Sequence, residues 1–185
     1  MTLSVSCFKK EVREVRKSQT VESCNTVYEI REPFTGIVFD LFDNGNTKEQ
    51  VGYKNGQKNG KHTRWYQSGI KMYEQNYKKG KLNGLWSYWY ENGQKLEEGS
   101  YIDGKHDELW ATWDWYGNKR HERTYKDGEL NGMWTYWHEN GQKLYEGSFK
   151  NGQRDGKWTV WNENGEVIRE QHYEEDELID TSKRE

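Results

Sequence analysis

Apolar and polar positions along this chain recur with a period of 24 residues. Six consecutive units without gaps run from Ile37 to Asp180, and they begin at Ile37, Lys61, Leu85, Leu109, Met133 and Lys157. Within each unit, short aromatic and aliphatic runs alternate with polar turn residues, which is typical of strands. Self-similarity at a fixed spacing predicts a repeat array in which each unit packs on its neighbours.

Turn signals divide the unit into two strands. Asn-Gly and Asp-Gly favour the positive φ values that two-residue hairpin turns require. One signal stands at the eighth and ninth positions of several units: Asn44-Gly45, Asn92-Gly93, Asn140-Gly141 and Asn164-Gly165. The other stands at the nineteenth and twentieth: Asn55-Gly56, Asp103-Gly104, Asp127-Gly128 and Asn151-Gly152. The sequence therefore predicts an all-β fold with strands of about six to eight residues.

A two-residue turn at the eighth and ninth positions also predicts the register of each hairpin. It places the fifth-position tryptophans opposite aliphatic residues, with the pairs Trp65 and Met72, Trp89 and Leu96, Trp137 and Leu144, and Trp161 and Ile168. It also sets Trp86 opposite Gly99 and Trp134 opposite Gly147, where a ring can cover the bare backbone of a strand glycine. Cross-strand pairs of these kinds stabilise a sheet.

The two tryptophan columns predict a sheet with an aromatic stripe on each face. Positions two and five differ by an odd number, so their side chains point to opposite faces of a regular strand. One face carries Trp89 and Leu96 with their equivalents, and the other carries Trp86, Tyr88 and Tyr101. No amphipathic helix is available to cover either stripe. We therefore expect an antiparallel β-hairpin meander that forms an elongated, twisted, single-layer sheet.

The repeat resembles a known family. Residues 125–134 read YKDGELNGMW, and the general pattern Y-x-[ND]-G-x-x-[ND]-G-x-W, followed by x-x-W-x-x-N-G, resembles the bacterial variant of the MORN repeat, the hallmark of YwqK-type antitoxins. Residues 27–45, with the block Pro-Phe-Thr-Gly at 33–36, are similar to that family's entry segment. The resemblance covers residues 27–180. It implies a MORN-like fold and a non-catalytic protein that docks or neutralises a partner, such as a toxin, through the sheet surface.

The resemblance also carries an alternative function. Eukaryotic MORN arrays are linked to membrane phospholipids and to scaffolding, which implies a scaffold that binds lipid. Aromatic repeat arrays can also bind sugars by stacking, so the alternative is a cell-envelope scaffold that binds lipid or polysaccharide through exposed aromatic residues. The chain departs from the repeat pattern in unit four, where Trp115-Tyr116-Gly117 replaces Glu-Asn-Gly, and at Glu108, which replaces the last glycine of unit three. We expect sequence-specific contacts at this central irregularity.

Outside the repeats, the sequence predicts short accessory segments. Residues 1–26 are expected to be a tail or linker, residues 27–36 an entry strand, residues 37–180 the six repeats, and residues 181–185 a C-terminal tail. The segment ending at Cys7 resembles the end of a bacterial lipoprotein signal. If Met1 is not the true start and Cys7 is lipidated, the protein belongs at the bacterial cell envelope; the alternative is the cytoplasm. Cys7 and Cys24 could instead pair in an exported chain.

Composition, net charge and the placement of histidines argue against several classes of function. The chain has 10 Trp and 13 Tyr but a formal net charge of only −3, so it lacks the basic excess of a nucleic-acid-binding protein. The five histidines occupy five different repeat positions and offer no metal-ligand spacing. We expect them to be surface residues of a polar sheet. The sequence predicts neither an enzyme nor a cofactor-binding protein, and it predicts no metal site.

Aromatic residues that vary between units are the candidates for partner binding. The fifth-position tryptophans recur in almost every unit, so we expect them to serve the packing of the array. A recurring glutamate, at Glu74, Glu98, Glu122, Glu146 and Glu170, is expected to keep one face hydrated. The residues that the repeat does not need, and that therefore suit a binding surface, are Tyr88, Tyr90, Trp115, Tyr116, Tyr136 and Tyr145.

Overall fold

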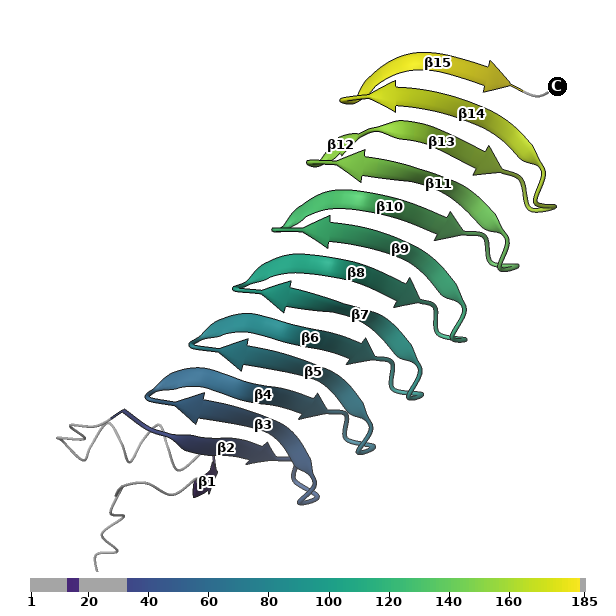
Figure 1. The fold of residues 1–185 in the computed structure, drawn as a ribbon. Helices are drawn as coiled ribbons and strands as arrows, with labels where there is room; N and C mark the ends of the chain where they lie inside the picture. The colour runs from purple at the N-terminus through teal and green to yellow at the C-terminus, as the bar shows by residue number, and fades with distance from the viewer. Residues whose placement is uncertain (1–12, 17–32, 184–185) are drawn as a thin grey trace, which may run out of the picture.

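The computed structural model describes residues 13–16 and 33–183, which form one open, twisted sheet in a single layer (Figure 1). Neighbouring strands are antiparallel from β2 to β15 and follow chain order, whereas β1 pairs with β2 in parallel. The strands are β1 Arg13–Arg16, β2 Gly36–Leu41, β3 Thr47–Lys54, β4 Gln57–Trp65, β5 Lys71–Lys78, β6 Lys81–Trp89, β7 Lys95–Ile102, β8 Lys105–Trp113, β9 Lys119–Lys126, β10 Glu129–Trp137, β11 Lys143–Lys150, β12 Gln153–Arg154, β13 Gly156–Trp161, β14 Val167–Glu174 and β15 Glu177–Lys183. The predicted all-β meander is confirmed. Within the described ranges, no helix has the length and apolar character needed to cross a membrane.

The two-residue turns at the nineteenth and twentieth positions are formed as predicted. Both central residues have positive φ, for example 51° at Asn55 and 73° at Gly56, as a type I′ turn requires. The flanking residues Lys54 and Gln57 pair directly. The last unit keeps this turn although it lacks the glycine, because Glu175 and Asp176 take φ values of 49° and 70°.

The turns at the eighth and ninth positions of the units differ from the predicted two-residue form. Here the glycine takes a positive φ, 85° at Gly45, while the residue before it does not. The amide of Phe42 donates to the carbonyl of Asn46, and the amide of Gly45 donates to the carbonyl of Phe42. The loop therefore has three residues. The Asn44 side chain supports it by accepting from the backbone amide of Asn46 at 3.0 Å, a local bond that asparagine makes readily in turns.

A β-bulge beyond this loop changes the register that the tryptophans adopt. In the third hairpin Trp89 lies opposite Lys95, Tyr88 lies opposite Glu97, and Leu96 is the extra residue. The predicted pairs of Trp with Met72, Leu96, Leu144 and Ile168 are therefore wrong by one residue; the actual partners are Lys71, Lys95, Lys143 and Val167. Because the loop and the bulge shift the register in opposite directions, the rest of each hairpin pairs as predicted. Trp86 lies opposite Gly99, and Trp134 lies opposite Gly147.

The strand glycines are covered by rings, although not by the rings that the sequence predicted. A Cβ on Gly99 would lie 2.1 Å from the ring of Trp110, and one on Gly147 would lie 2.1 Å from the ring of Trp158. These tryptophans belong to the following strand on the other side of the glycine. Each glycine therefore lets the tryptophan of the next hairpin lie flat on the backbone and reach back toward the previous one.

Most units have a second irregularity where one hairpin pairs with the next. Between β5 and β6 the register slips after Tyr77 and Leu82 pair, and Gly84 at this slip has a φ of 103°. At the equivalent place between β7 and β8 stands Glu108, which adopts a φ of 59°. A non-glycine residue in this conformation is strained by about 1–2 kcal/mol. Glu108 therefore differs from the glycines of the other units in its side chain, whereas its backbone keeps their positive φ.

Candidate docking surface

One face of the sheet is built from repeated ion pairs and indole rings; we call it the ion-pair face. The recurring glutamates lie here, and each accepts from a lysine three residues earlier or from the adjacent strand. Lys95 donates to Glu98 at 2.6 Å, and Lys119 and Lys143 pair with Glu122 and Glu146 in the same way. The Ser87 hydroxyl also donates to Glu98, at 3.0 Å. The glutamate column is therefore part of the packing of each unit.

The same lysines bind the units to one another. The Nζ atoms of Lys71, Lys95, Lys119 and Lys143 lie 5.7–5.8 Å from the ring centroid of the fifth-position tryptophan in the next unit. Such cation–π contacts contribute about 0.5–1 kcal/mol each at exposed sites. Because each of these lysines already contacts a tryptophan of the next unit, this geometry favours the expected packing role for the fifth-position tryptophans.

The opposite face carries a continuous network of rings; we call it the aromatic face. Trp86 contacts Trp110 with ring centroids 5.4 Å apart, and Trp134 contacts Trp158 at 5.9 Å. Further along the strands, Tyr136 stacks on Tyr145 at 4.8 Å. No second layer covers these rings in the described part of the chain, so most of them remain partly exposed.

Three of the five histidines lie on the aromatic face. The expectation that the histidines are surface residues of a polar sheet is therefore wrong for these three. His62 is only 6 % exposed and its Nε2 lies 3.0 Å from Oε1 of Glu49. His106 stacks on Tyr125 with centroids 5.0 Å apart, and His121 stacks on Tyr136 at 4.7 Å. His62 and His121 stand in columns that hold tryptophan or tyrosine in other units, so their flat rings fit the aromatic rows.

Arg123 interrupts the row of tryptophans at the middle of the aromatic face. Its Cα lies opposite both Trp110 on β8 and Trp134 on β10, at the position that Gly99 and Gly147 hold in the neighbouring units. With an arginine in place of glycine, the tryptophans form two contacting pairs, one on each side of Arg123, instead of one unbroken row.

Polar atoms without partners gather around Arg123. Its own Nε, Nδ1 of His121 and Oγ1 of Thr112 are buried and have no hydrogen-bond partner within the described residues. Burial, together with the positive charges of Arg123 and Arg120, lowers the pKa of His121 to about 4. Burial raises the pKa of Glu97 more strongly than the charge of Arg123 lowers it. The arginine therefore has a carboxyl group nearby but makes no ion pair with it.

The structure divides the predicted binding residues into two groups. Tyr88, Tyr136 and Tyr145 lie on the aromatic face, where Tyr88 contacts Trp86 at 6.0 Å and the other two stack on each other. Tyr90 and Trp115 lie instead at the edge formed by the three-residue loops, with ring centroids 5.2 Å apart. Tyr116 is beside them and is 83 % exposed. Both groups remain candidates for partner binding.

Sequence reasoning missed Arg123 and His121, although the repeat frame contained the signal. The fifteenth position of the six units reads Val51, Gln75, Gly99, Arg123, Gly147 and Gln171. Arg123 is the one charged residue in a column that the aromatic face buries. Pairing of this column with the Trp110 and Trp134 column follows from the confirmed part of the register, so the sequence could have placed the arginine between two indoles.

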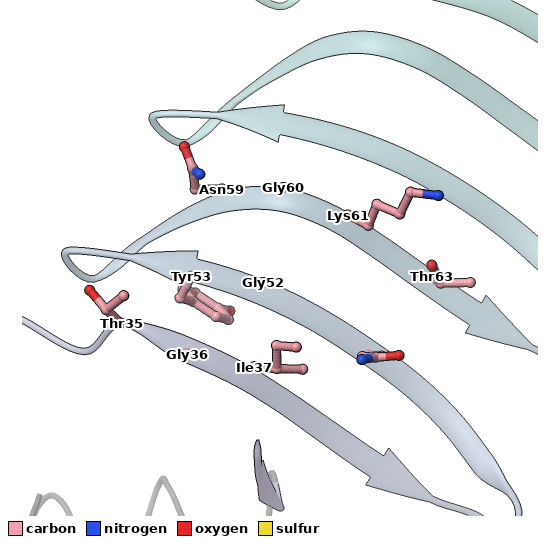
Figure 2. A pocket seen from close by; sticks show the side chains of 10 residues that line it. Thr35, Gly36, Ile37, Gly52, Tyr53, Asn59, Gly60, Lys61 and Thr63 are labelled. Atoms are coloured by element: carbon pink, nitrogen blue, oxygen red, sulfur yellow. The ribbon is translucent and has the colours of Figure 1, made fainter. Parts of the chain in front are cut away.

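A hollow of about 400 Å³ lies near the start of the array, between β2, β3 and β4 (Figure 2). Tyr53 and Lys61 are the only titratable residues in its lining, and Lys61 Nζ already pairs with Glu74 at 2.8 Å. Across residues 13–16 and 33–183, no group of three His, Cys, Asp or Glu side chains is placed to hold a metal ion. The hollow thus offers no set of groups suited to catalysis, and the aromatic face is the stronger candidate site.

Cys7 and Cys24 lie outside the described residues. Lipidation of Cys7, an envelope location and the alternative scaffold role therefore remain predictions from the sequence.

Comparison with known families gives an independent account of the repeats. Residues 58–79, 82–103, 130–151 and 154–175 match the model of the MORN repeat variant. The four segments keep the 24-residue frame, and residues 104–129, which contain Arg123 and His121, fall between the matched copies. A search of curated proteins gave no match to the chain. Four segments of the chain are therefore similar to the MORN repeat variant, and residues 104–129 depart from its pattern.

Proposed function

We propose that this MORN-repeat protein is a non-enzymatic docking module that binds a partner protein through its aromatic face. The observation that carries the proposal is the uncovered network of Trp, Tyr and His rings on one side of a single-layer sheet. Large rings with a polar tip dominate binding energy at protein interfaces. The opposite face is less suited to docking, because its lysines, glutamates and tryptophans already satisfy each other.

Toxin neutralisation is the finer part of this proposal. Its support is the resemblance of the repeat pattern to YwqK-type antitoxins and the absence of a catalytic set of groups in the hollow near Lys61. In this role the partner is a toxin protein, and the rigid array blocks it by covering its surface. A toxin gene beside the gene for this protein would supply the partner to test.

Co-expression and affinity capture test the docking function and the antitoxin role separately. The tagged full chain is expected to retain its partner after washing, and Tyr136→Ser and Tyr145→Ser are expected to weaken retention at least tenfold. Tyr116→Ser tests the other group of candidates, at the loop edge, and should change retention less than twofold if the aromatic face is the docking surface. Equal retention by wild type and both aromatic-face variants would refute docking through this face. Unrestrained toxicity during co-expression would refute the antitoxin role alone.

A further inference from the structure

We infer that Arg123 is the anchor on the aromatic face for a carboxylate group of the partner protein, an aspartate or glutamate side chain. This inference rests on the proposed docking function and names the chemistry of its central contact. The Cα of Arg123 lies opposite both Trp110 and Trp134, at the position that glycines occupy in the neighbouring units. The docking face therefore has an arginine at its centre, with a tryptophan on the strand to either side.

The first argument is the missing partner for this charge. Among the described residues the side chain of Arg123 makes no ion pair and no hydrogen bond, whereas Arg154 pairs with Asp176 at 3.0 Å and Nζ of Lys58 lies 3.4 Å from Nδ1 of His62. Arg123 is partly buried and its Nε is fully buried without an acceptor. A guanidinium withdrawn from water without an acceptor is costly, so an incoming anion gains more there than at an exposed arginine.

The second argument is the charge of the surrounding face. From β7 to β14, the row of Arg123 and the neighbouring row that contains His121 have only three charged side chains: Glu97, Arg123 and the exposed Arg169. Glu97 precedes Arg123 in the array, and no acidic residue follows it in these rows before β15. The C-terminal half of the face is therefore open to an acidic group, while Glu97 opposes one that approaches from its side.

The third argument is geometric complementarity. The planar guanidinium presents parallel N–H donors that match the two oxygens of a carboxylate. Burial of the Nε atom limits access of water, which strengthens such a bond. A single arginine among rings suits one acidic side chain of a protein better than a phosphate polymer, whose binding needs several cations in a line.

Side-chain NMR of the full chain tests the inference without knowledge of the partner. The probe is the blocked tripeptide Gly-Glu-Gly, with Gly-Gln-Gly and inorganic phosphate as matched probes. We expect Gly-Glu-Gly to shift the Nε–Hε resonance of Arg123 and the indole N–H resonances of Trp110 and Trp134 in a saturable way. Gly-Gln-Gly should give no shift. A larger saturable response to phosphate than to Gly-Glu-Gly would overturn the assignment to a protein carboxylate.

Substitutions that are expected to weaken binding of Gly-Glu-Gly, and one that is expected to strengthen it, extend the test. Arg123→Gln and Arg123→Gly, the latter restoring the residue of the neighbouring units, should abolish the indole response while circular dichroism stays that of a sheet. Glu97→Gln should tighten binding at least threefold, because it removes a repelling carboxylate. Arg169→Gln removes an equal charge from the same face and should change affinity less than twofold. Equal losses in the Arg123 and Arg169 variants would indicate general electrostatic attraction and overturn the inference.

The outcomes separate this inference from the docking function. If Arg123→Gln retains the captured partner with unchanged affinity, the anchor is refuted and docking through the aromatic face stands. If wild type captures no partner but Arg123 binds Gly-Glu-Gly specifically, the carboxylate site stands and the docking function fails.

Discussion

At the scale of single residues, Gly99 shows how tightly a one-layer sheet packs its rings. Since an added Cβ would lie 2.1 Å from the Trp110 ring, Gly99→Ala must displace that ring. We expect the free energy of unfolding to fall by about 1–3 kcal/mol, as for other overpacked sites. Urea unfolding gives the free energy, and near-ultraviolet circular dichroism reports the displaced indole.

The matched control for that prediction is Gly93→Ala. The space around Gly93 is open, but its φ is 87°, so the substitution costs about 1–2 kcal/mol through backbone strain alone. Its near-ultraviolet spectrum should match wild type. If Gly99→Ala also leaves this spectrum unchanged, Trp110 does not lie over Gly99 in solution.

His121 couples the aromatic face to pH. Its pKa in the folded chain is about 4, below the ordinary value of 6.5, so the unfolded chain binds the proton more readily. Stability is therefore expected to fall as pH decreases from about 6.5 to about 4. His121→Tyr, which introduces the residue found at Tyr73 and Tyr145, should reduce this loss. Urea unfolding at pH 7 and pH 5 measures it; equal losses in both proteins would contradict the assignment.

At the scale of the hairpin, Lys79 is poorly suited to the first central position of a type I′ turn. Its φ is 50°, and the equivalent turns use Asn55, Asp103, Asp127, Asn151 and, in the last unit, Glu175. We expect Lys79→Asn to raise the free energy of unfolding by about 0.5–1 kcal/mol, because asparagine tolerates positive φ better. Lys78→Asn, one residue earlier and within β5, is the control and should not stabilise the chain. Thermal and urea unfolding of the two variants give the comparison.

The same turns show how far sequence reasoning reaches. Asn55-Gly56 and Asn44-Gly45 carry the same dipeptide, yet only the first forms a two-residue turn. At Asn44 the side chain accepts from the amide of Asn46, and this local bond favours the three-residue loop. A dipeptide signal cannot separate these outcomes, because they differ in how the flanking strands pair. The repeat frame, by contrast, fixed the strand order and the far half of each register correctly.

The candidate site was only partly predictable for a related reason. Variation between units marked Tyr88, Tyr136 and Tyr145 as exceptions to the repeat, and all three lie on the aromatic face. Tyr116 was marked by the same rule and lies at the loop edge. Variation of a position between units shows that the repeat does not need a particular side chain there. Only the pairing across strands shows which residues lie on the same face of the sheet. Identification of Arg123 as a site residue required both the variation in its column and the cross-strand pairing.

At the scale of the whole molecule, the sheet is a one-dimensional array in which each hairpin contacts only its neighbours. Its Trp–Lys contacts repeat across every junction from unit two onward, and contacts between tryptophans of the aromatic face join units three and four and units five and six. Stability in such arrays is approximately a sum of unit and junction contributions. Removal of one whole unit, which keeps the 24-residue frame, should therefore leave a folded sheet whose denaturant m-value is lower by about one-eighth.

Two deletions of equal length then locate the specific function within the array. Deletion of residues 61–84 removes a unit distant from Arg123, and deletion of residues 109–132 removes the arginine and brings Trp134 into the place of Trp110 beside Gly99. Both chains should show sheet-type circular dichroism and cooperative unfolding. The first should keep the saturable indole response to Gly-Glu-Gly, and the second should lose it, because no arginine then lies opposite the tryptophans of the aromatic face. Loss of the response in both chains would mean that the carboxylate site depends on the length of the array rather than on its irregular unit.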